Sequence, residues 1–307
     1  MKPADTTLMP PLVSIVIPTY NHAHFLDRAL RSVMEQSYAN WEAIVIDNHS
    51  QDNTDEVVNG FGDLRIKLLK IHNHGVIAAS RNLGMRAAHG EWIAFLDADD
   101  CWYPRKLEIV VGTATSGDAY DVLSNDELLV DVRNGTRRVI RFGPYCSNFY
   151  RVLLLEGNRL SPSATVVRRA FLVRHGIEFD ERQDYATVED YAFWLELARN
   201  EARFKFIPEV HGEYVVHGAN SSARIANHLK NAQRLLHDHV FTVQRFESTP
   251  ERLWKRVAAR LRLAEATRLA AASQWTAALR MALQALRDSP RATAGFIFAR
   301  LKRTFGR

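Results

Sequence analysis

The chain has 307 residues, of which 47% are apolar and 10% aromatic, so it can form one large domain with an appendage or two modest domains, and its composition argues against intrinsic disorder. Its two cysteines provide no disulfide framework and fit a reducing cytosol. The net charge is +5, but residues 251–307 carry 13 Lys and Arg against 3 Asp and Glu. Residues 1–250 therefore carry a net negative charge, which disfavours nucleic-acid binding by this part of the chain.

The first hundred residues alternate strand patterns with helix patterns. A β-branched run at 13–17 ends before Pro18, and apolar residues recur at helical spacing from 24 to 35. Further strands are predicted at 42–47, 65–71 and 91–97, and further helices at 50–59 and 76–88. This alternation predicts a parallel sheet built from crossover units. Ligands bind such sheets beyond the carboxyl ends of the strands, where Asp47 and Asp97 stand.

The remaining elements change in character near residues 222–226. Before this point we predict strands within 120–141, at 163–168 and within 203–216, and a helix at 187–200. After it no strand pattern remains, and three or four helices are predicted, at 226–247, 250–272, 274–288 and 291–304. Pro250 and Pro290 stand where helices can begin.

The acidic run Asp97-Ala98-Asp99-Asp100 follows directly after a predicted buried strand. Carboxylates at positions i and i+2 can converge on one hard cation, and Mg²⁺ or Mn²⁺ usually completes its shell with substrate phosphates. A cation held there would act as a Lewis acid on a departing diphosphate. The alternative interpretation is a solvated acidic turn that caps the next helix, and the run by itself does not decide between the two.

Two other polar residues have a functional and a structural interpretation. Asp47 closes a strand and can accept hydrogen bonds from a nucleotide base or ribose, or it can be a turn residue, because the following stretch is rich in turn formers. Arg81 lies in a helix with small residues at 78–80 and at Gly84, which permit close packing. Its guanidinium can then reach a phosphate or a carboxylate, or it can simply be solvated.

Together these motifs resemble those of family 2 glycosyltransferases in order and spacing. The resemblance covers about the first 110 residues and rests on VSIVIPTYN at 13–21, IVIDNHSQDNT at 44–54, NHG at 73–75 leading into ASRNLG at 79–84, and GEWIAFLDADD at 90–100. It implies an α/β fold of the GT-A type, with a Rossmann-like nucleotide-binding half at 1–110 and an acceptor-binding half at 111–224. The basic region at 225–307 follows as a C-terminal helical part.

The same resemblance implies an activity. It predicts inverting transfer from a nucleotide diphosphate sugar, usually UDP-linked, assisted by Mn²⁺ or Mg²⁺. The acceptor would be a saccharide or a lipid-linked saccharide, and the product a bacterial surface polysaccharide such as capsule or O-antigen.

Residues of the nucleotide-binding half take their expected roles from this resemblance. The nucleotide-sugar-binding set is Pro18, Thr19, Tyr20, Asp47, Arg81 and Asp97. Within it, Asp47 matches the aspartate that binds the pyrimidine base, and Asp97 the acidic residue near the ribose. Asp99 matches the metal ligand. Asn48 stands where the family often has a second acidic residue, which leaves Asp47 as the sole carboxylate there.

Three residues farther along complete the predicted site. Glu189-Asp190 resembles the family's acidic motif at the head of an apolar helix, with Asp190 as the base that deprotonates the acceptor hydroxyl and Glu189 as an acceptor-binding or orienting residue. Acidic residues in a first helical turn also favour the helix dipole, which is the structural alternative. His217 resembles a late histidine that reaches metal or diphosphate in some relatives, although a lone histidine is more often structural.

The basic tail has three interpretations. Leu253 and Val257 on one predicted helix, and Trp275, Leu279 and Leu283 on the next, fall at helical spacing. These stripes can form the core of a helical bundle, a basic amphipathic surface for anionic lipid, or a self-association face. The N-terminus lacks signal-peptide features, and no stretch approaches the roughly 18 apolar residues of a spanning helix. We therefore expect a cytoplasmic protein, at most peripheral at the inner face of the cytoplasmic membrane.

Two other functions compete with glycosyl transfer. A metal-dependent nucleotidyltransferase also combines an α/β nucleotide fold with carboxylates, but it usually has a glycine-rich basic loop after the first strand, and residues 18–22 (PTYNH) have neither feature. A non-catalytic sugar-nucleotide binding or scaffold protein would need a broken site, and the sequence retains Asp47, Asp97, Asp99 and Asp190.

Overall fold

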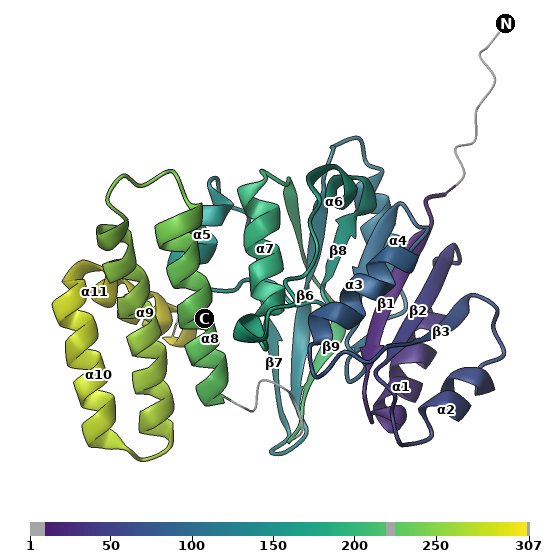
Figure 1. The fold of residues 1–307 in the computed structure, drawn as a ribbon, viewed down its shortest axis with the longest axis horizontal. Coiled ribbons are helices and arrows are strands. Elements are labelled where there is room, and N and C mark those ends of the chain that lie inside the picture. Colours follow the sequence, from purple (N-terminus) through teal and green to yellow (C-terminus); the bar gives the residue numbers. More distant parts are fainter. Residues whose placement is uncertain (1–9, 219–224, 306–307) are drawn as a thin grey trace, which may run out of the picture. The chain divides into compact units, whose positions relative to one another are not determined.

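The computed structural model describes residues 10–218 and 225–305 (Figure 1). The chain divides into two units, the first made of Met1–Tyr145, Leu160–Glu181 and Glu189–Asn220, and the second of Cys146–Arg159, Arg182–Val188 and Ser221–Arg307. Two short segments of the range 111–224 thus belong to the second unit. The division into functional halves at residues 110 and 224 stays a prediction.

The first unit holds all the strands of the described chain and most of its short helices. The strands are β1 Val13–Thr19, β2 Trp41–Asp47, β3 Ile66–Lys70, β4 Trp92–Phe95, β5 Cys101–Trp102, β6 Val122–Asp131, β7 Thr136–Ile140, β8 Thr165–Arg168 and β9 Phe204–Val216. The helices are α1 Ala23–Met34, α2 Thr54–Gly60, α3 Ile77–Ala87, α4 Lys106–Ala114, α6 Arg169–His175 and α7 Glu189–Arg199. The mixed α/β class expected from the sequence is confirmed.

One mixed sheet runs through this unit in the order β3-β2-β1-β4-β8-β6-β9-β5, with β7 paired to β6. The first four strands are parallel, as their alternation with helices predicts, and their register places Thr19 beside Asp47. Beyond β4 the pairing becomes antiparallel at β8. The carboxyl ends of β1, β2 and β4 therefore meet at one edge of the sheet, where ligands bind in folds of this kind.

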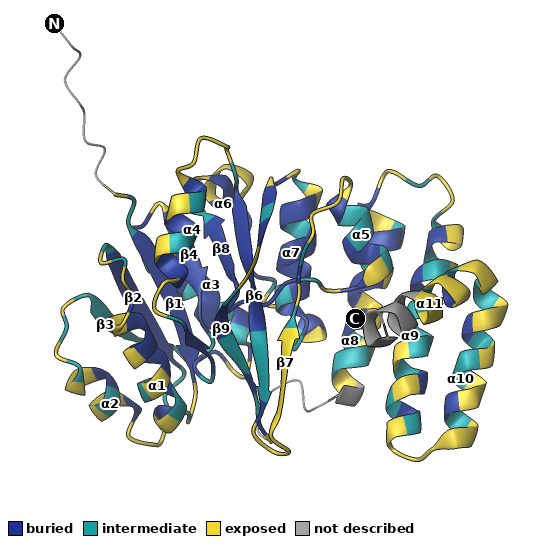
Figure 2. Cartoon of the chain, turned by 180° about the vertical axis from the view of Figure 1, so that it is seen from behind, coloured by how far each residue is buried: buried dark blue, intermediate teal, exposed yellow. Residues whose placement is uncertain are grey.

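Helices cover both faces of the parallel strands, and the sheet lies between them as the buried layer in Figure 2. Alternate residues such as Val13, Ile15 and Ile17 face a core cluster that includes residues of α1, α2 and α4. The opposite face packs against α3, where a Cβ added to Gly84 would lie 2.4 Å from Val16 Cγ1. The absence of a side chain at position 84 thus lets the helix approach the sheet closely.

The Glu42 side chain connects the amino ends of the parallel strands. These ends lie at the edge of the sheet opposite the predicted site. Its carboxylate accepts hydrogen bonds from Ser14 Oγ at 2.8 Å, the His89 backbone N–H at 2.8 Å and Lys67 Nζ at 3.0 Å. Burial alone would raise the pKa of Glu42, but these three hydrogen bonds hold it below the usual value of a glutamate. The ionised carboxylate therefore links β1, β2 and β3 to the turn before β4.

Several elements were not predicted. Helices α4 and α6, strand β5 and helix α5 (Phe149–Glu156) fall where the sequence pattern was left unassigned. The region 203–216, expected to hold several strands, is the single strand β9. Its pairing with β6 shifts in register around Pro208, because proline has no N–H to donate to a neighbouring strand.

Helices make up the described part of the second unit. They are α5 Phe149–Glu156, α8 Ile225–Asp238, α9 Pro250–Ala271, α10 Trp275–Asp288 and α11 Pro290–Phe305, with a 3₁₀ turn at Gln183–Tyr185 and a π-helical turn at His239–Val243. Both Pro250 and Pro290 begin helices, as predicted. Leu253 and Val257 are buried, so the stripe of α9 is a core face. Among the described residues no helix has the length and apolarity needed to cross a membrane.

Candidate active site

The first loop of the site follows β1. Pro18 and Thr19 end this strand, and Tyr20 behind them is 53% exposed. The Thr19 hydroxyl is buried and has no hydrogen-bond partner among the described residues. A buried hydroxyl without a partner carries a free-energy cost that a ligand atom could relieve.

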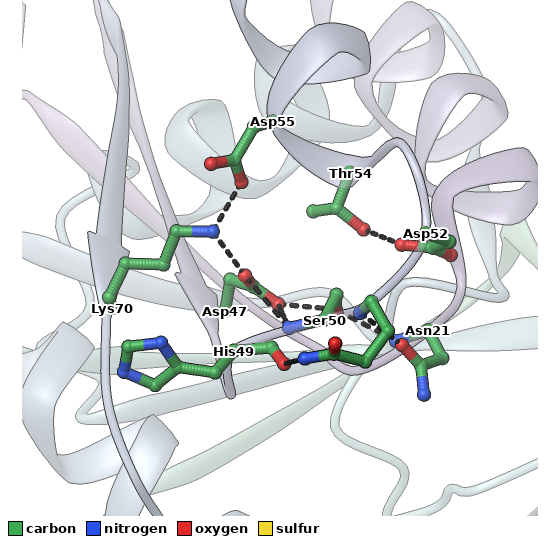
Figure 3. A network of polar contacts seen from close by, with 9 residues as sticks. Asn21, Asp47, His49, Ser50, Asp52, Thr54, Asp55 and Lys70 are labelled. Carbon is green, nitrogen blue, oxygen red and sulfur yellow. Dashed lines mark hydrogen bonds and ion pairs between the residues drawn. The ribbon is translucent and has the colours of Figure 1, made fainter.

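Asp47 ends β2 and is completely buried within a polar network (Figure 3). Its carboxylate accepts hydrogen bonds from Ser50 Oγ at 2.5 Å, from the Ser50 backbone N–H at 3.1 Å, and from Lys70 Nζ at 2.6 Å. Lys70 also pairs with Asp55. The prediction from sequence missed Lys70, although the parallel register that pairs it with Asp47 follows from aligning the two strands.

The side chain of Asn48, which stands where the family often has an acidic residue, has a structural role. Its side-chain oxygen accepts a hydrogen bond from the Asn73 backbone N–H at 2.8 Å, which joins the loop after β2 to the loop after β3. The first two loops are joined as well, because the Asn21 backbone N–H donates to Ser50 Oγ at 2.8 Å and the Asn21 side chain accepts from Gln51 N–H (Figure 3). The three loops therefore form one connected rim.

Arg81 lies in the middle of the predicted site and is only 3% exposed. It donates from Nη2 to Asp97 Oδ1 at 2.7 Å and from Nη1 to Glu189 Oε1 at 2.9 Å. Burial alone would lower the pKa of Arg81, but the charges of Asp97 and Glu189, and then of Asp190, raise it. This arginine thus faces carboxylates, one of the two partner types expected for it, and links α3, the end of β4 and the start of α7.

Glu189 and Asp190 occupy the first turn of α7. The apolar face predicted for this helix is confirmed, because Tyr191, Trp194 and Leu195 are buried. Glu189 is buried against Arg81, whereas Asp190 acts on the same guanidinium through its charge. The acidic motif at 189–190 is therefore held beside the acidic run at 97–100, although about ninety residues separate them in the chain.

Asp99 and His217 lie together. Asp99 Oδ2 and His217 Nε2 are 2.9 Å apart, and the imidazole stacks on Phe25 with ring centroids 4.5 Å apart. Burial and the neighbouring charge of Asp97 raise the pKa of Asp99, while His217 opposes this change. One carboxylate, that of Asp99, thus lies against the imidazole that follows β9, with the charge of Asp97 close enough to act on it.

Asp100 is turned into the protein. Its Oδ2 accepts a hydrogen bond from Ser163 Oγ at 2.5 Å, and its Oδ1 accepts one from the Val215 backbone N–H at 2.8 Å. Ser163 Oγ also accepts a hydrogen bond from the Asp97 backbone N–H at 3.1 Å. One serine therefore holds both ends of the acidic run, a role that only the tertiary contacts reveal.

Two buried ionisable residues near this serine, Lys106 and Glu127, act on each other through their charges. Lys106 donates to the Ser163 carbonyl oxygen and lies 4.5 Å from the centroid of the Trp102 ring. Burial lowers the pKa of Lys106 to about 7, although the negative charge of Glu127 acts to raise it. Burial raises the pKa of Glu127 to about 7, although the positive charge of Lys106 acts to lower it. The support of the acidic run thus includes ionisable groups that have almost no contact with water.

The residues expected to bind metal have suitable donor types. A carboxylate and an imidazole suit Mn²⁺, and the carboxylates also suit Mg²⁺. Within residues 10–218 and 225–305, however, no group of three or more His, Cys, Asp or Glu side chains is arranged to hold a metal ion. The protein groups fit a shared site in which a ligand's oxygen atoms would supply the rest of the shell.

The chain is similar in sequence to known glycosyltransferases. Residues 14–175 match the family model described as glycosyl transferase family 2. Over 190 residues the chain is 33% identical to the Escherichia coli protein WfgD, described as UDP-Glc:alpha-D-GlcNAc-diphosphoundecaprenol beta-1,3-glucosyltransferase, which covers 62% of this chain and 70% of that protein. Two other curated relatives are matched over 46% and 40% of their length.

Solved structures share the fold. TarS 1–349 of S. aureus in complex with UDP-GlcNAc matches with a TM-score of 0.65 and 17% identity, covering 94% of this chain and 92% of that one. The mannosyltransferase PcManGT from Pyrobaculum calidifontis, in complex with GDP-Man and Mn²⁺, matches with a TM-score of 0.54 and 22% identity, covering 96% and 81%. The predicted GT-A type fold is confirmed.

Proposed function

We infer that this chain, which belongs to glycosyl transferase family 2, transfers a sugar from a nucleotide diphosphate sugar to a saccharide or lipid-linked saccharide acceptor with inversion. The observation that carries this proposal is the pair of ion pairs made by Arg81, to Asp97 at 2.7 Å and to Glu189 at 2.9 Å. They hold the acidic motif of α7 next to the acidic run after β4. A donor bound at the strand ends would then have a candidate base beside it.

The donor is proposed to be UDP-linked. Tyr20, Thr19 and Asp47 lie on the rim formed by the β1 and β2 loops, which would contact the nucleoside, while Asp97 would lie near the ribose. UDP-linked sugars are named for WfgD and for the TarS complex, and a diphosphoundecaprenol-linked acceptor is named for WfgD. By this similarity the product would be a surface polysaccharide, assembled at the cytoplasmic face of the membrane.

Asp99 and His217 would hold a divalent cation, Mn²⁺ or Mg²⁺, together with the diphosphate. When bound, such a cation supplies Lewis-acid stabilisation of the charge on the departing diphosphate. The residues of this chain supply the rest. Arg81 orients Asp97 and Glu189, and a bound cation would favour the ionised form of Asp99, whose pKa burial and the charge of Asp97 raise.

Asp190 would serve as the general base. Its carboxylate would take the proton of the acceptor hydroxyl as that oxygen forms a bond to the anomeric carbon from the face opposite the diphosphate. The bond from the anomeric carbon to the diphosphate oxygen breaks, and its electron pair leaves with the nucleoside diphosphate. One bond forms and one breaks at the same carbon, so its configuration inverts.

The base is tested by Asp190→Asn, with Glu196→Gln on the same helix as the control, because Glu196 forms a partly exposed ion pair with Arg199 and has no proposed part in the reaction. Asp190→Asn should bind UDP normally in calorimetry and lose transfer by at least about 100-fold in an assay of UDP release. The control should keep near wild-type turnover. Near-normal transfer by Asp190→Asn would place the base elsewhere.

The metal role is tested separately. Asp99→Asn should lose the increase in UDP affinity that Mn²⁺ produces, and unchanged affinity in Mn²⁺ would contradict the assignment. A thermal-stabilisation screen with UDP-, GDP- and dTDP-sugars identifies the donor, because a ligand that binds the folded state raises its apparent stability.

A further inference from the structure

A large groove lies within the second unit, between helices that the proposed chemistry does not use. Its volume is about 1840 Å³, and α9, α10 and α11 supply most of its lining, with a contribution from α5. Leu263, Leu279 and Phe296 are among its apolar side chains. The groove is therefore large enough for a sizeable apolar group.

Positive charge surrounds this groove. Six basic side chains line it: Arg151, Arg252, Lys255, Arg256, Arg260 and Arg291. In the described part of the chain none of the six forms an ion pair, whereas two of the three acidic lining residues are already paired, Glu156 with Arg159 and Asp288 with Arg262. The lining thus carries an excess of uncompensated positive charge.

Part of this positive charge is poorly solvated. Nε and Nη2 of Arg260 are buried and have no hydrogen-bond partner among the described residues. Burial lowers the pKa of Arg256, and the neighbouring charge of Arg151 lowers it further. Donors of this kind are most stable with an anionic acceptor, because a buried charge without a partner is costly.

An apolar stripe borders the same groove. Trp275 and Leu279 line the groove and are nevertheless 67% and 62% exposed, and Leu283 and Leu286 continue the stripe along α10. A different side of α10 is buried at Ala278 and Ala285, so the exposed stripe lies outside the bundle core, and Figure 2 shows the exposed residues along this helix. Four large apolar side chains along one exposed helix face need a partner.

We propose that the groove and the stripe of α10 form a docking surface for a bilayer that contains anionic phospholipid. The basic rim would contact lipid phosphates, and Trp275 and Leu279 would enter the interface between headgroups and acyl chains. Tryptophan favours this region, because its ring is apolar and its N–H needs a polar partner.

The charge of the surface selects this occupant over the alternatives. A second copy packed through the same surface would bring the two sets of unpaired basic residues together, and like charges repel. A nucleic acid would satisfy the basic rim but would leave the apolar stripe in water. An anionic bilayer complements both features at once.

The test uses the full chain and vesicles, without substrate. The protein should sediment with phosphatidylcholine vesicles that contain about 30% phosphatidylglycerol, should sediment far less with pure phosphatidylcholine, and should be released by high salt. Equal binding to both vesicle types, or no binding to either, would overturn the proposal. The readout needs no turnover, so the result is independent of the glycosyl transfer proposed above.

Two variants with matched controls locate the surface. The triple variant Arg252→Gln, Lys255→Gln, Arg291→Gln changes exposed residues only and should weaken binding by about 100-fold, at roughly fivefold per charge. The control Arg138→Gln, Arg169→Gln, Arg174→Gln makes the same charge change at exposed residues of the first unit and should bind normally. Equal losses in the two variants would show only a dependence on net charge and would refute a defined surface.

The apolar stripe has its own test. Trp275→Ala with Leu279→Ser should lose vesicle binding, whereas Leu64→Ser with Val173→Ser, at exposed positions of the first unit, should retain it. Trp275 is 67% exposed, whereas Trp254 is of intermediate burial and the other four tryptophans are buried, so the protection of fluorescence from acrylamide by vesicles should come mainly from Trp275 and should largely disappear in Trp275→Phe. If the first pair instead abolishes self-association in sedimentation velocity and vesicles do not bind, the occupant is a second copy and the proposal fails.

Discussion

Arg81 allows a direct comparison of a buried and an exposed ion pair on one helix. Arg81→Met keeps much of the side-chain volume and removes the charge that faces Asp97 and Glu189. Arg86→Met makes the same change one turn later on α3, where Arg86 and its partner Glu178 are about half exposed, at 52% and 50%. The two substitutions differ mainly in the burial of the pair that is broken.

The structure predicts very different losses in the free energy of unfolding. Removing Arg81 leaves two carboxylates close together, one of them almost fully buried, and breaking such a pair costs about 3–5 kcal/mol. The exposed pair of Arg86 contributes at most about 1 kcal/mol, because water screens it and two long side chains must be ordered to form it. The expected difference is therefore at least about 2 kcal/mol.

Urea unfolding at pH 7.5, followed by circular dichroism, measures both variants. Adding Glu189→Gln to Arg81→Met should recover part of the loss, because it removes one of the two uncompensated carboxylates. Arg81→Met should also lose glycosyl transfer, since Asp97 and Glu189 would no longer be held in position. The reasoning would be refuted if Arg81→Met were no less stable than Arg86→Met.

Three further changes test the core of the first unit by the same urea method. Lys106→Met should cost about 1–3 kcal/mol, because it removes the hydrogen bond to the Ser163 carbonyl oxygen and the charge that opposes Glu127, and adding Glu127→Gln should recover part of that loss; a double variant as unstable as the single one would contradict the charge interaction. Glu42→Gln should cost about 1–3 kcal/mol at pH 7. Folding lowers the pKa of Glu42, so the stabilisation by its carboxylate is present above the unfolded value near 4.3 and is lost as the pH falls through the lower folded value. The free energies of unfolding of the variant and the wild type should therefore converge at low pH. A difference that stays constant with pH would count against this explanation. Gly84→Ala should cost about 1–3 kcal/mol through contact with Val16, and Val16→Ala should relieve part of that cost.

The first hundred residues could be assigned from the sequence because each element carries its own periodic pattern. All three crossover helices and four strands of the parallel part lie where this pattern predicts them, within a few residues. Beyond residue 100 the pattern fails where short helices are buried on several sides. Helix α4 illustrates this, since its first residue, Lys106, is ionisable and yet fully buried. Such a residue is stable there only because of partners that are distant in sequence.

The candidate site shows the same limit. Asp47, Asp97, Asp99 and Asp190 could be selected by motif, because acidic residues at strand and helix ends are visible in the sequence. Most of their contacts could not, because Lys70 reaches Asp47 through strand register and Ser163 reaches Asp100 through packing; His217 was selected by resemblance, but its contact with Asp99 appears only in the structure. Their roles in catalysis and metal binding stay predictions until the variants above are measured.

The three aspartates of the acidic run differ only in what they face. Asp97 is bound by Arg81 of α3, and Asp99 lies beside His217 after β9. Asp100 is only 2% exposed, and both of its carboxylate oxygens accept hydrogen bonds from within the protein, so it has almost no surface to offer a ligand. Because Ser163 connects Asp100 to the backbone of Asp97, the buried aspartate fixes the turn that presents the other two. The positions of Asp97 and Asp99 therefore depend on the third acidic residue of the run, although that residue is itself buried.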